Sequence, residues 1–346
     1  MLQTRNDTTN ASADTRFERL ENLLTAAHKA GADACEAVFA ESRSLSVGVR
    51  KGTVETVERD ENSDLGLRVF VGQKQAVVSV SEFSQATLDR LVERAVAMAK
   101  LAPDDAYAGL ADPTLLYKGE PVDLQLFDDT HLSAESLQQR ALDIEAAGLS
   151  IGNDALQSDA ASTGYVQNQW SMLTSGGFRG HHQSSLFFQS GRYIATDAEG
   201  NMERDGEGRS VRFASDLPDV SDTGRIAAER ALAALGGRKI ETQKATVIFD
   251  KRIAKSLISQ FIGAISGTMI ARGSSFLKDR LGQQLFDSSV QIIDNPLRVR
   301  GLGSCLFDDE GVAVSERAII KDGVLNGWLL NSSAAKQLGM TTTGHA

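Results

Sequence analysis

The sequence predicts an α+β protein with more than one domain, and three observations support that fold class. Stretches with a helical period of apolar residues are interspersed with stretches in which apolar and polar residues alternate one by one, as in strands. Turn signals rich in Gly, Asn and Asp separate the strand-like runs closely enough for antiparallel pairing. At 346 residues, with 41% hydrophobic residues, 31 Gly and 5 Pro, the chain has the composition of a globular protein of two or three domains. We therefore expect two helix-plus-antiparallel-sheet units followed by a β-rich C-terminal domain.

The first unit is expected to span residues 15–102, after a polar disordered tail, 1–14, that lacks the apolar core of a secretory signal. A helix beginning near Phe17 ends at Gly31, since glycine is favoured just beyond a helix C-terminus. Ser84 is a good N-cap for a second helix. The inward side of that helix is predicted to carry Leu88, Leu91, Val92, Ala95 and Met98. An antiparallel meander with one buried face is predicted between the helices, with strands at 45–49, 65–71 and 76–80 and turns at 51–52, 62–64 and 72–73.

The second unit, residues 118–238, repeats the theme after an irregular connector. Ser133 is predicted to cap a helix whose apolar side carries Leu137, Ala141 and Ile144. Asp222 is predicted to cap a later helix that ends at two glycines, 236–237. Strands are expected between these helices at 165–173, 185–188 and 209–213, with turns at 175–177 and 199–201.

The third unit, residues 239–346, is expected to be the β-rich domain. It opens with a strand at 246–249, then a single regular helix over 251–271 that Asp250 caps, then a Gly-Ser-Ser turn at 273–275. Asp322 and Gly323 form a typical hairpin turn. Because the chain stops without a closing strand or helix, we expect this domain to be incomplete, with unpaired sheet edges near its end.

One stripe of the helix predicted over 251–271 consists of small residues. Glycines inside a helix cost stability, so their presence suggests that another segment packs very close to that face. The alternative is a plain amphipathic core helix. The stripe contains Ser259, Gly263, Gly267 and Ala271.

Three segments of the sequence, 222–239, 246–277 and 308–330, resemble the TldD/PmbA (TldE) family of bacterial peptidase proteins, and the resemblance extends over the chain from about Phe17. In the TldD branch, the helix before the Gly-Ser-Ser turn carries a His-Glu-x-x-x-His zinc motif. When the two turns are aligned, the two His positions fall on Ile258 and Gly263, and the Glu position falls on Ser259. None of these side chains can bind zinc or act as a general base. The resemblance is therefore to the PmbA/TldE branch, whose members pair with TldD.

The other polar constellations are weaker. The acidic cluster at 308–311 would present carboxylates to a metal or a basic peptide, or else forms an acidic turn at a strand end. The adjacent residues His181 and His182 would point to opposite sides of a strand and are interpreted as turn or surface residues rather than metal ligands. Cys35 and Cys305 are interpreted as small buried hydrophobic residues rather than a disulfide or a reactive thiol, which fits a reducing cytoplasm. The loop at 301–304 lacks the third glycine and the following helix of a phosphate-binding loop.

The function that the resemblance implies is a non-catalytic, cytoplasmic subunit of a two-component zinc peptidase. A TldD-like homologous subunit would supply the zinc, this chain would hold no cofactor, and it would help form the cleft for a peptide or unfolded protein, such as a peptide-antibiotic precursor or an antitoxin. An extended peptide would bind by strand addition, and a homodimer is expected when the partner is missing. Residues expected to contact substrate or partner are Ser259, Gly263, Gly267, Ser274, Ser275, Asp308 and Asp309.

Two alternatives remain open from the sequence. One is a non-enzymatic binding or regulatory protein of the DNA-gyrase-modulator type, which the resemblance also suggests. The other is an independent hydrolase that uses the carboxylates at 308–310. A net charge of −10 argues against direct contact with nucleic acid or a membrane surface, and no apolar run reaches the length of a membrane span.

Overall fold

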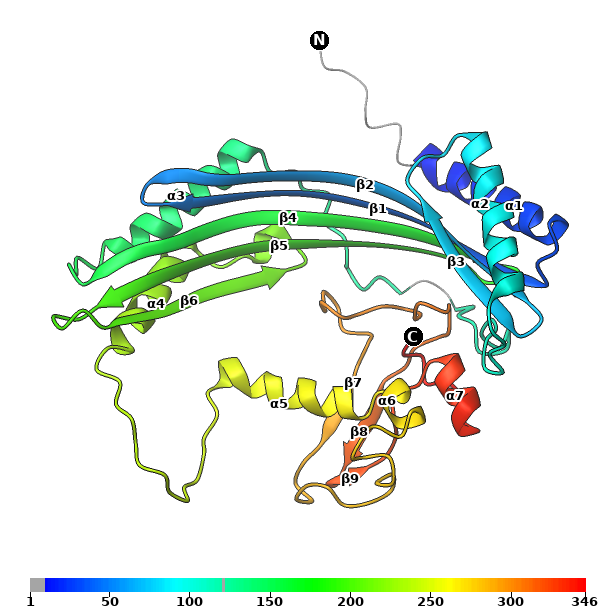
Figure 1. Cartoon of the computed structure of the whole chain (residues 1–346). Coiled ribbons are helices and arrows are strands. Elements are labelled where there is room, and N and C mark those ends of the chain that lie inside the picture. The colour runs from blue at the N-terminus through cyan, green and yellow to red at the C-terminus, as the bar shows by residue number, and fades with distance from the viewer. Residues whose placement is uncertain (1–9, 120–121) are drawn as a thin grey trace, which may run out of the picture.

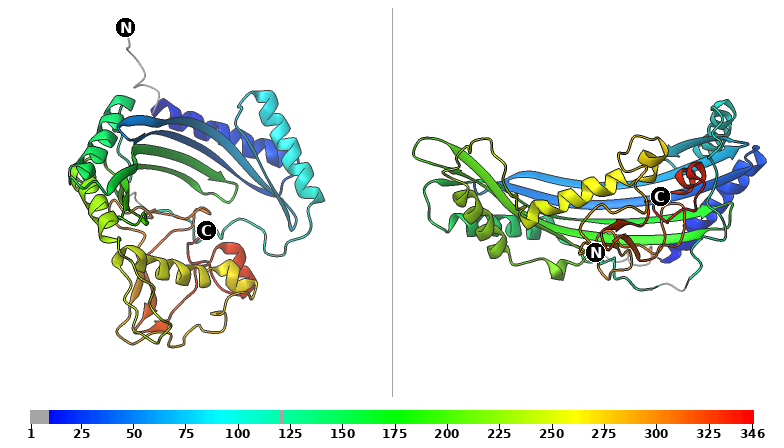
Figure 2. Two further views of the ribbon diagram at one scale, coloured as in Figure 1. Left: turned by 60° about the vertical axis from the view of Figure 1, so that its left-hand side comes forward. Right: turned by 90° about the horizontal axis from the view of Figure 1, so that it is seen from below.

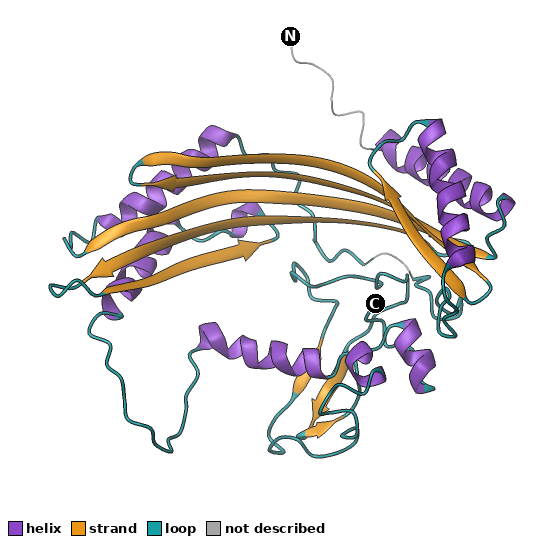
Figure 3. Ribbon diagram, viewed as in Figure 1, coloured by secondary structure: helices purple, strands orange, loops and turns teal. Residues whose placement is uncertain are grey.

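A computed structural model describes residues 10–119 and 122–346. In this structure a long six-stranded antiparallel sheet arches over a smaller C-terminal unit that contains a three-stranded sheet (Figures 1 and 3). The strand order in the large sheet is β3-β2-β1-β4-β5-β6, and in the small one β7-β8-β9. The mixed helix and antiparallel-sheet fold class predicted from the sequence is confirmed.

The first three strands form the predicted meander, but they are longer than the alternating runs that predicted them. They are β1 (Ala34–Arg50), β2 (Thr53–Val71) and β3 (Lys74–Val80). The predicted turn at 51–52 is present, with Lys51 and Gly52 at φ 52° and 74°, as a two-residue hairpin turn requires. The turn predicted at 62–64 is wrong, because those residues continue β2 and pair with β1, with Asn62 opposite Ser42.

Two helices cover one end of this meander. They are α1 (Asn10–Lys29) and α2 (Gln85–Leu101), and α2 begins at Ser84 as predicted. The first helix includes residues 10–14 of the segment expected to be a tail, and residues 1–9 lie outside the described residues. Leu91, Val92 and Ala95 of α2 are buried in the core, whereas the expectation that Met98 faces inwards is wrong: it is 42% exposed, and Val96 and Ala99 are buried instead.

The central unit consists of α3 (Ala134–Leu149), β4 (Leu156–Thr174), β5 (Arg179–Thr196), β6 (Met202–Val211), a 3₁₀ turn (Ala214–Asp216) and α4 (Val220–Ala233). Ser133 caps α3 as predicted, with its side chain accepting a hydrogen bond from the Ser136 N–H. The cap predicted for α4 was three residues too late. Asp219 is the N-cap and accepts a hydrogen bond from the Ser221 N–H, so Asp222 lies in the first turn.

The two units share one sheet, because β1 pairs with β4 from Glu36 opposite Thr174 to Val49 opposite Ala161. The hairpin turn of the first unit is also held by the second. Glu145 of α3 is buried, and its two carboxylate oxygens accept hydrogen bonds from the N–H groups of Lys51 and Gly52 at 2.7 and 2.6 Å. The first two predicted units therefore form one continuous layer.

Successive residues of a strand point to opposite faces of the sheet, so odd and even residues contact different parts of the protein. Odd residues of β1, such as Cys35 and Val47, belong to the cores under α1, α2 and α3. On the opposite face, Val38, Trp170 and Met172 belong to a cluster with Phe307 of the C-terminal unit. The helices therefore cover one face and the C-terminal unit approaches the other, as the views in Figure 2 show.

The C-terminal unit contains α5 (Lys251–Ala264), α6 (Gly267–Ala271), α7 (Ser332–Leu338), β7 (Ile292–Asp294), β8 (Arg317–Lys321) and β9 (Val324–Leu325). The predicted hairpin turn is present between β8 and β9, with Asp322 and Gly323 at φ 50° and 76°. The described part of this unit is less β-rich than predicted, because its strands have only three, five and two residues.

The strand predicted at 246–249 is absent. These residues lack regular structure and are exposed, with Ile248 91% exposed. Alternation alone does not make a strand where no neighbouring segment supplies ladder hydrogen bonds. In the described part of the chain, no helix has the length and apolar character needed to cross a membrane.

Candidate functional site

The helix predicted over 251–271 is broken in two. Asp250 caps α5 as expected: the Arg252 N–H donates a hydrogen bond to the Asp250 carboxylate. The prediction of one regular helix is wrong, because the chain leaves the helix at Ile265 and Ser266. There the Gly267 N–H donates to the Leu329 carbonyl at 2.7 Å, and the Leu329 N–H donates to the Ile265 carbonyl at 3.0 Å. Pairing with the segment around Leu329 replaces the helical hydrogen bonds at this point.

The break divides the small-residue stripe into two halves with different surroundings. At Gly263 a Cβ atom would meet nothing within 4 Å, whereas at Gly267 it would lie 2.8 Å from the Leu329 carbonyl oxygen and 3.0 Å from the Ala334 Cβ. Gly267 is therefore required for packing inside the C-terminal unit, since real Cβ contacts are almost never that short. Gly263 faces open space, as does Ser259, whose hydroxyl donates to the Lys255 carbonyl.

The whole of α5 is poorly covered. None of its residues is buried, although it has a pronounced apolar side. The apolar side chains with the largest exposed fractions are Ile253 at 55%, Leu257 at 48% and Ile258 at 45%. Burying such side chains is worth about 1.5–3 kcal/mol each, so an exposed row of them is the kind of surface that a partner covers.

The two serines of the Gly-Ser-Ser turn have different environments. Ser275 is buried, and its hydroxyl donates to the Ala264 carbonyl at 2.5 Å and accepts from the Leu277 N–H at 3.0 Å. It therefore ties the C-terminus of α5 to the turn. Ser274 is exposed, and its hydroxyl donates to the Met269 carbonyl at 3.2 Å.

The acidic cluster at 308–311 forms a tight turn. The Asp308 Oδ1 atom accepts from the N–H groups of Glu310 and Val312 at 3.0 and 2.9 Å, and its Oδ2 atom accepts from the Ala346 N–H. A carboxylate of Glu310 accepts from the Ser332 N–H at the start of α7, where the helix dipole favours a negative charge. The structure therefore agrees with the interpretation of an acidic turn. Asp309 is the member of the cluster for which the described part of the chain shows no hydrogen-bond partner.

A cavity of about 270 Å³ lies between the sheet and the C-terminal unit, and it brings together residues far apart in the sequence. Asp308 and Asp309 are the only two predicted contact residues in its wall; the other five lie elsewhere. The sheet contributes Trp170 and His182, which are opposite each other in the β4–β5 register. The C-terminal unit contributes Asp294, Pro296, Gly303, Cys305, Phe307, Asp308, Asp309, Val314, Gly344, His345 and Ala346.

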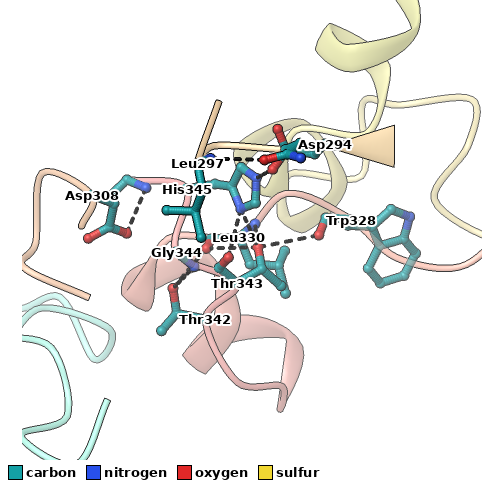
Figure 4. Close-up of polar contacts among 11 residues, drawn as sticks. Asp294, Leu297, Asp308, Trp328, Leu330, Thr342, Thr343, Gly344 and His345 are labelled. Carbon is teal, nitrogen blue, oxygen red and sulfur yellow. Dashed lines mark hydrogen bonds and ion pairs between the residues drawn. The ribbon is translucent and has the colours of Figure 1, made fainter. Parts of the chain in front are cut away.

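His345 is held in the cavity wall by polar contacts from both ring nitrogens (Figure 4). Its Nε2 atom pairs with the Asp294 carboxylate at 3.0 Å, and its Nδ1 atom contacts the Thr343 carbonyl at 2.8 Å and the Thr343 hydroxyl at 3.0 Å. Thr343 in turn donates its N–H to the Leu330 carbonyl. This network fixes the segment after α7 against β7.

The two adjacent histidines point to opposite faces of β5, as expected for strand neighbours, but they do not lie in a turn. His181 contacts the Ser171 hydroxyl at 3.0 Å, whereas His182 is half-buried in the cavity wall. Burial lowers the pKa of His182, and the nearby Arg212 and His181 lower it further. His182 is therefore neutral at pH 7.

Arg212 fastens the loop that forms one side of the cavity. It is buried, and it donates to the carbonyls of Ser185, Leu302 and Gly301 at 2.9, 2.6 and 3.3 Å. The loop at 301–304 therefore presents its carbonyl groups to a cation, whereas a phosphate loop presents N–H groups to an anion.

Cys305 is a free thiol in the cavity wall, and Cys35 is a free, buried thiol in the first unit. Burial raises the pKa of the Cys305 thiol, and the charges of Asp308, Asp309 and Asp294 raise it further. A raised pKa keeps the sulfur protonated, so Cys305 is not an activated nucleophile.

The described residues contain no group of three or more His, Cys, Asp and Glu side chains that could hold a metal ion. Ile258, Ser259 and Gly263, which the sequence comparison predicts to occupy the motif positions, are exposed on α5. Sequence reasoning missed the cavity, because its walls come from β4, β5 and loops more than a hundred residues later. The one available signal was the presence of His182 and Trp170 in facing strands.

Three family models match the chain in order: PmbA/TldA metallopeptidase domain 1 at residues 35–99, the central domain at 127–235 and the C-terminal domain at 242–346. The chain belongs to the PmbA/TldD family.

Individual relatives agree with this assignment. The chain is 34% identical to the metalloprotease PmbA of Escherichia coli O157:H7 over 316 residues, which cover 91% of this chain and 69% of that protein. It is also 34% identical to a PmbA homologue of Haemophilus influenzae, covering 92% of this chain and 70% of the homologue.

Solved structures share the fold. A protein of Bacteroides thetaiotaomicron, described as a candidate modulator of DNA gyrase, superimposes with a TM-score of 0.91 at 24% identity, covering 96% of this chain and 76% of that one. TldE of Thermococcus kodakarensis superimposes with a TM-score of 0.80 at 17% identity, covering 94% of this chain and 73% of that one.

Proposed function

We propose that this chain is the PmbA/TldE-like subunit of a two-component cytoplasmic zinc metallopeptidase. A TldD-like homologous subunit binds the zinc ion, and this chain completes the cleft for a peptide or unfolded protein. The family membership and the 34% identity to PmbA support the proposal. The observation that carries it is the state of α5, an exposed apolar helix. The residues that the alignment of the Gly-Ser-Ser turns assigns to the zinc motif are Ile258, Ser259 and Gly263, and they lie on this helix.

The geometry of α5 favours a protein partner over a bound metal. Ile and Gly offer no ligand atoms in their side chains, and the Ser259 hydroxyl donates back to the helix. Three large apolar side chains on the same helix are about half exposed. A homologous subunit is the occupant that fits best, because it presents the corresponding helix of the same fold. The same surface would let the chain form a homodimer when the partner is missing.

The acidic turn does not favour the alternative of an independent hydrolase. Both oxygens of Asp308 are engaged by backbone N–H groups, which hold the carboxylate in place within the turn. The remaining alternative, a regulatory protein of the gyrase-modulator type, rests on the description of a structural relative that is only 24% identical.

A reconstitution assay tests the proposal. Cleavage of an unfolded protein is measured with this chain alone, with a TldD-like subunit alone and with the mixture, each with and without a zinc chelator. We expect zinc-dependent cleavage to need the TldD-like subunit and to rise when this chain is added. Zinc-dependent cleavage by this chain alone would contradict the proposal.

A further inference from the structure

The cavity between the sheet and the C-terminal unit has the size of a subsite for one side chain. Its volume is about 270 Å³, whereas pockets for whole small molecules measure about 300–1,000 Å³. It is lined by the half-buried ring of Trp170 and the buried ring of Phe307, whose centroids lie 5.6 Å apart in an edge-to-face arrangement. Flat aromatic walls favour a flat or extended apolar stem with a charged end.

The charges on the cavity wall are mainly negative. Asp308 is engaged by three N–H groups and Asp294 by His345. Asp309 has no hydrogen-bond or ion-pair partner in the described part of the chain. Partial burial and the neighbouring Glu310 raise the pKa of Asp309, which is the effect expected of a carboxylate that lacks a compensating cation.

The cationic side chains of the neighbouring elements either bind other groups or lie outside the cavity wall, so they do not neutralise Asp309. Arg212 donates to three backbone carbonyls and to no carboxylate. Arg317 lies opposite Asp294 in the β7–β8 register and is not part of the cavity wall. His182, the second imidazole in the wall, is neutral because its pKa is lowered. The field of the three aspartates also converges on Cys305, whose thiol they help to keep protonated.

We propose that this cavity binds the guanidinium group of a peptide arginine, with Asp309 accepting its N–H groups and the rings of Trp170 and Phe307 lining the space around the group and its apolar stem. A guanidinium group matches both features of the cavity wall, the unpaired carboxylate and the aromatic rings. It pairs with a carboxylate through two parallel hydrogen bonds, and it packs against aromatic rings. A metal ion fits less well, because the described residues hold no metal-binding group. The role of the site in selecting substrates rests on the proposed function, but binding is a property of this chain alone.

Tryptophan fluorescence tests the site directly, because the chain has only two tryptophans, Trp170 and Trp328. In a Trp328→Phe background, Trp170 is the only reporter. The probe is the blocked tripeptide acetyl-Ala-Arg-Ala-amide, and the control is the same peptide with citrulline, which keeps the shape of arginine without its charge. We expect a saturable change in fluorescence with the arginine peptide and no saturable change with the citrulline peptide.

A pair of matched aspartate variants identifies the binding group. Asp309→Asn should weaken binding of the arginine peptide about tenfold, as expected for the loss of a hydrogen-bonded charge pair. Asp154→Asn removes another exposed carboxylate, which lies outside the cavity wall, and should leave the affinity unchanged. Isothermal titration calorimetry of the chain with both tryptophans present gives the same comparison without the Trp328 substitution.

The inference would be overturned by the absence of saturable binding of the arginine peptide in both methods, by equal binding of the citrulline peptide, or by an unchanged affinity in Asp309→Asn. Equal affinity for a lysine peptide would also overturn it, because it would show a general negative field rather than a guanidinium site. None of these measurements uses the zinc subunit. If the arginine peptide binds but the reconstituted mixture does not cleave, the proposed function is rejected and the binding site stands. If the mixture cleaves but the arginine peptide does not bind, only the binding site is rejected.

Discussion

The two parts of the segment 251–271, α5 and α6, share a stripe of small residues but have opposite surroundings. In α6, Gly267 is packed against the backbone of Leu329, and Ile270 is buried. In α5, Gly263 faces open space and no residue is buried. A stripe of small residues therefore has two meanings in one segment: in α6 it permits close packing within the chain, and in α5 it marks a surface still open to another molecule.

The largest expected effect on stability comes from filling the tight position. Gly267→Ala places a Cβ atom 2.8 Å from the Leu329 carbonyl oxygen and from the Leu330 Cδ2 atom. Overpacking of this kind costs about 1–3 kcal/mol, and the backbone at the contact is held by hydrogen bonds. We expect the midpoint of urea unfolding to fall accordingly. A midpoint equal to that of the unsubstituted protein would show that Gly267 is not a packing residue.

The link between α5 and the turn comes next. Ser275→Ala removes the hydroxyl that bonds the Ala264 carbonyl and the Leu277 N–H, so we expect a loss of about 1 kcal/mol in the free energy of unfolding. The matched control is Ser274→Ala, which removes an exposed hydroxyl one residue away and should change stability by less than about 0.5 kcal/mol. Equal losses of stability in the two variants would contradict the claim that the Ser275 hydroxyl, and not that of Ser274, ties α5 to the turn.

The open position should respond in the opposite direction to Gly267. Gly263→Ala meets nothing within 4 Å, and alanine is favoured over glycine inside a helix by about 0.5–1 kcal/mol. We therefore expect a small gain in stability, measured by the same urea titration. A loss comparable to that of Gly267→Ala would mean that the two halves of the stripe are packed alike.

The smallest effect concerns pH and lies outside the stripe, in the cavity wall. Burial, then Arg212 and His181, lower the pKa of His182 below its usual 6.5, so the unfolded chain binds more protons than the folded one between the lowered pKa and 6.5. The contribution of His182 to stability is complete above pH 6.5 and falls as the pH drops through that window. His182→Gln should make unfolding less dependent on pH between 5 and 7. An unchanged dependence would show that His182 does not titrate as described.

Local features of this protein could be predicted from the sequence, and features that depend on distant partners could not. The caps at Ser133 and Asp250 and the hairpin turn at 322–323 involve residues a few positions apart, so residue types alone identify them. The break at Ile265 depends on Leu329, and the contact of His345 depends on Asp294, 51 residues away. The sharing of one sheet by two units depends on the pairing of β1 with β4. Periodicity within a segment carries no information about such partners.

The measurement that tests the central claim most directly is the affinity of this chain for a TldD-like subunit after a charge is placed on α5. Leu257→Asp substitutes an apolar side chain that is 48% exposed, and the matched control, Met98→Asp, substitutes one that is 42% exposed on α2. Both substitutions lie on helix surfaces and should leave the fold intact, as circular dichroism would check. The account predicts that Leu257→Asp weakens association at least tenfold, about 1.4 kcal/mol, and that Met98→Asp leaves it unchanged. Equal affinities of the two variants would contradict the claim that α5 receives the partner.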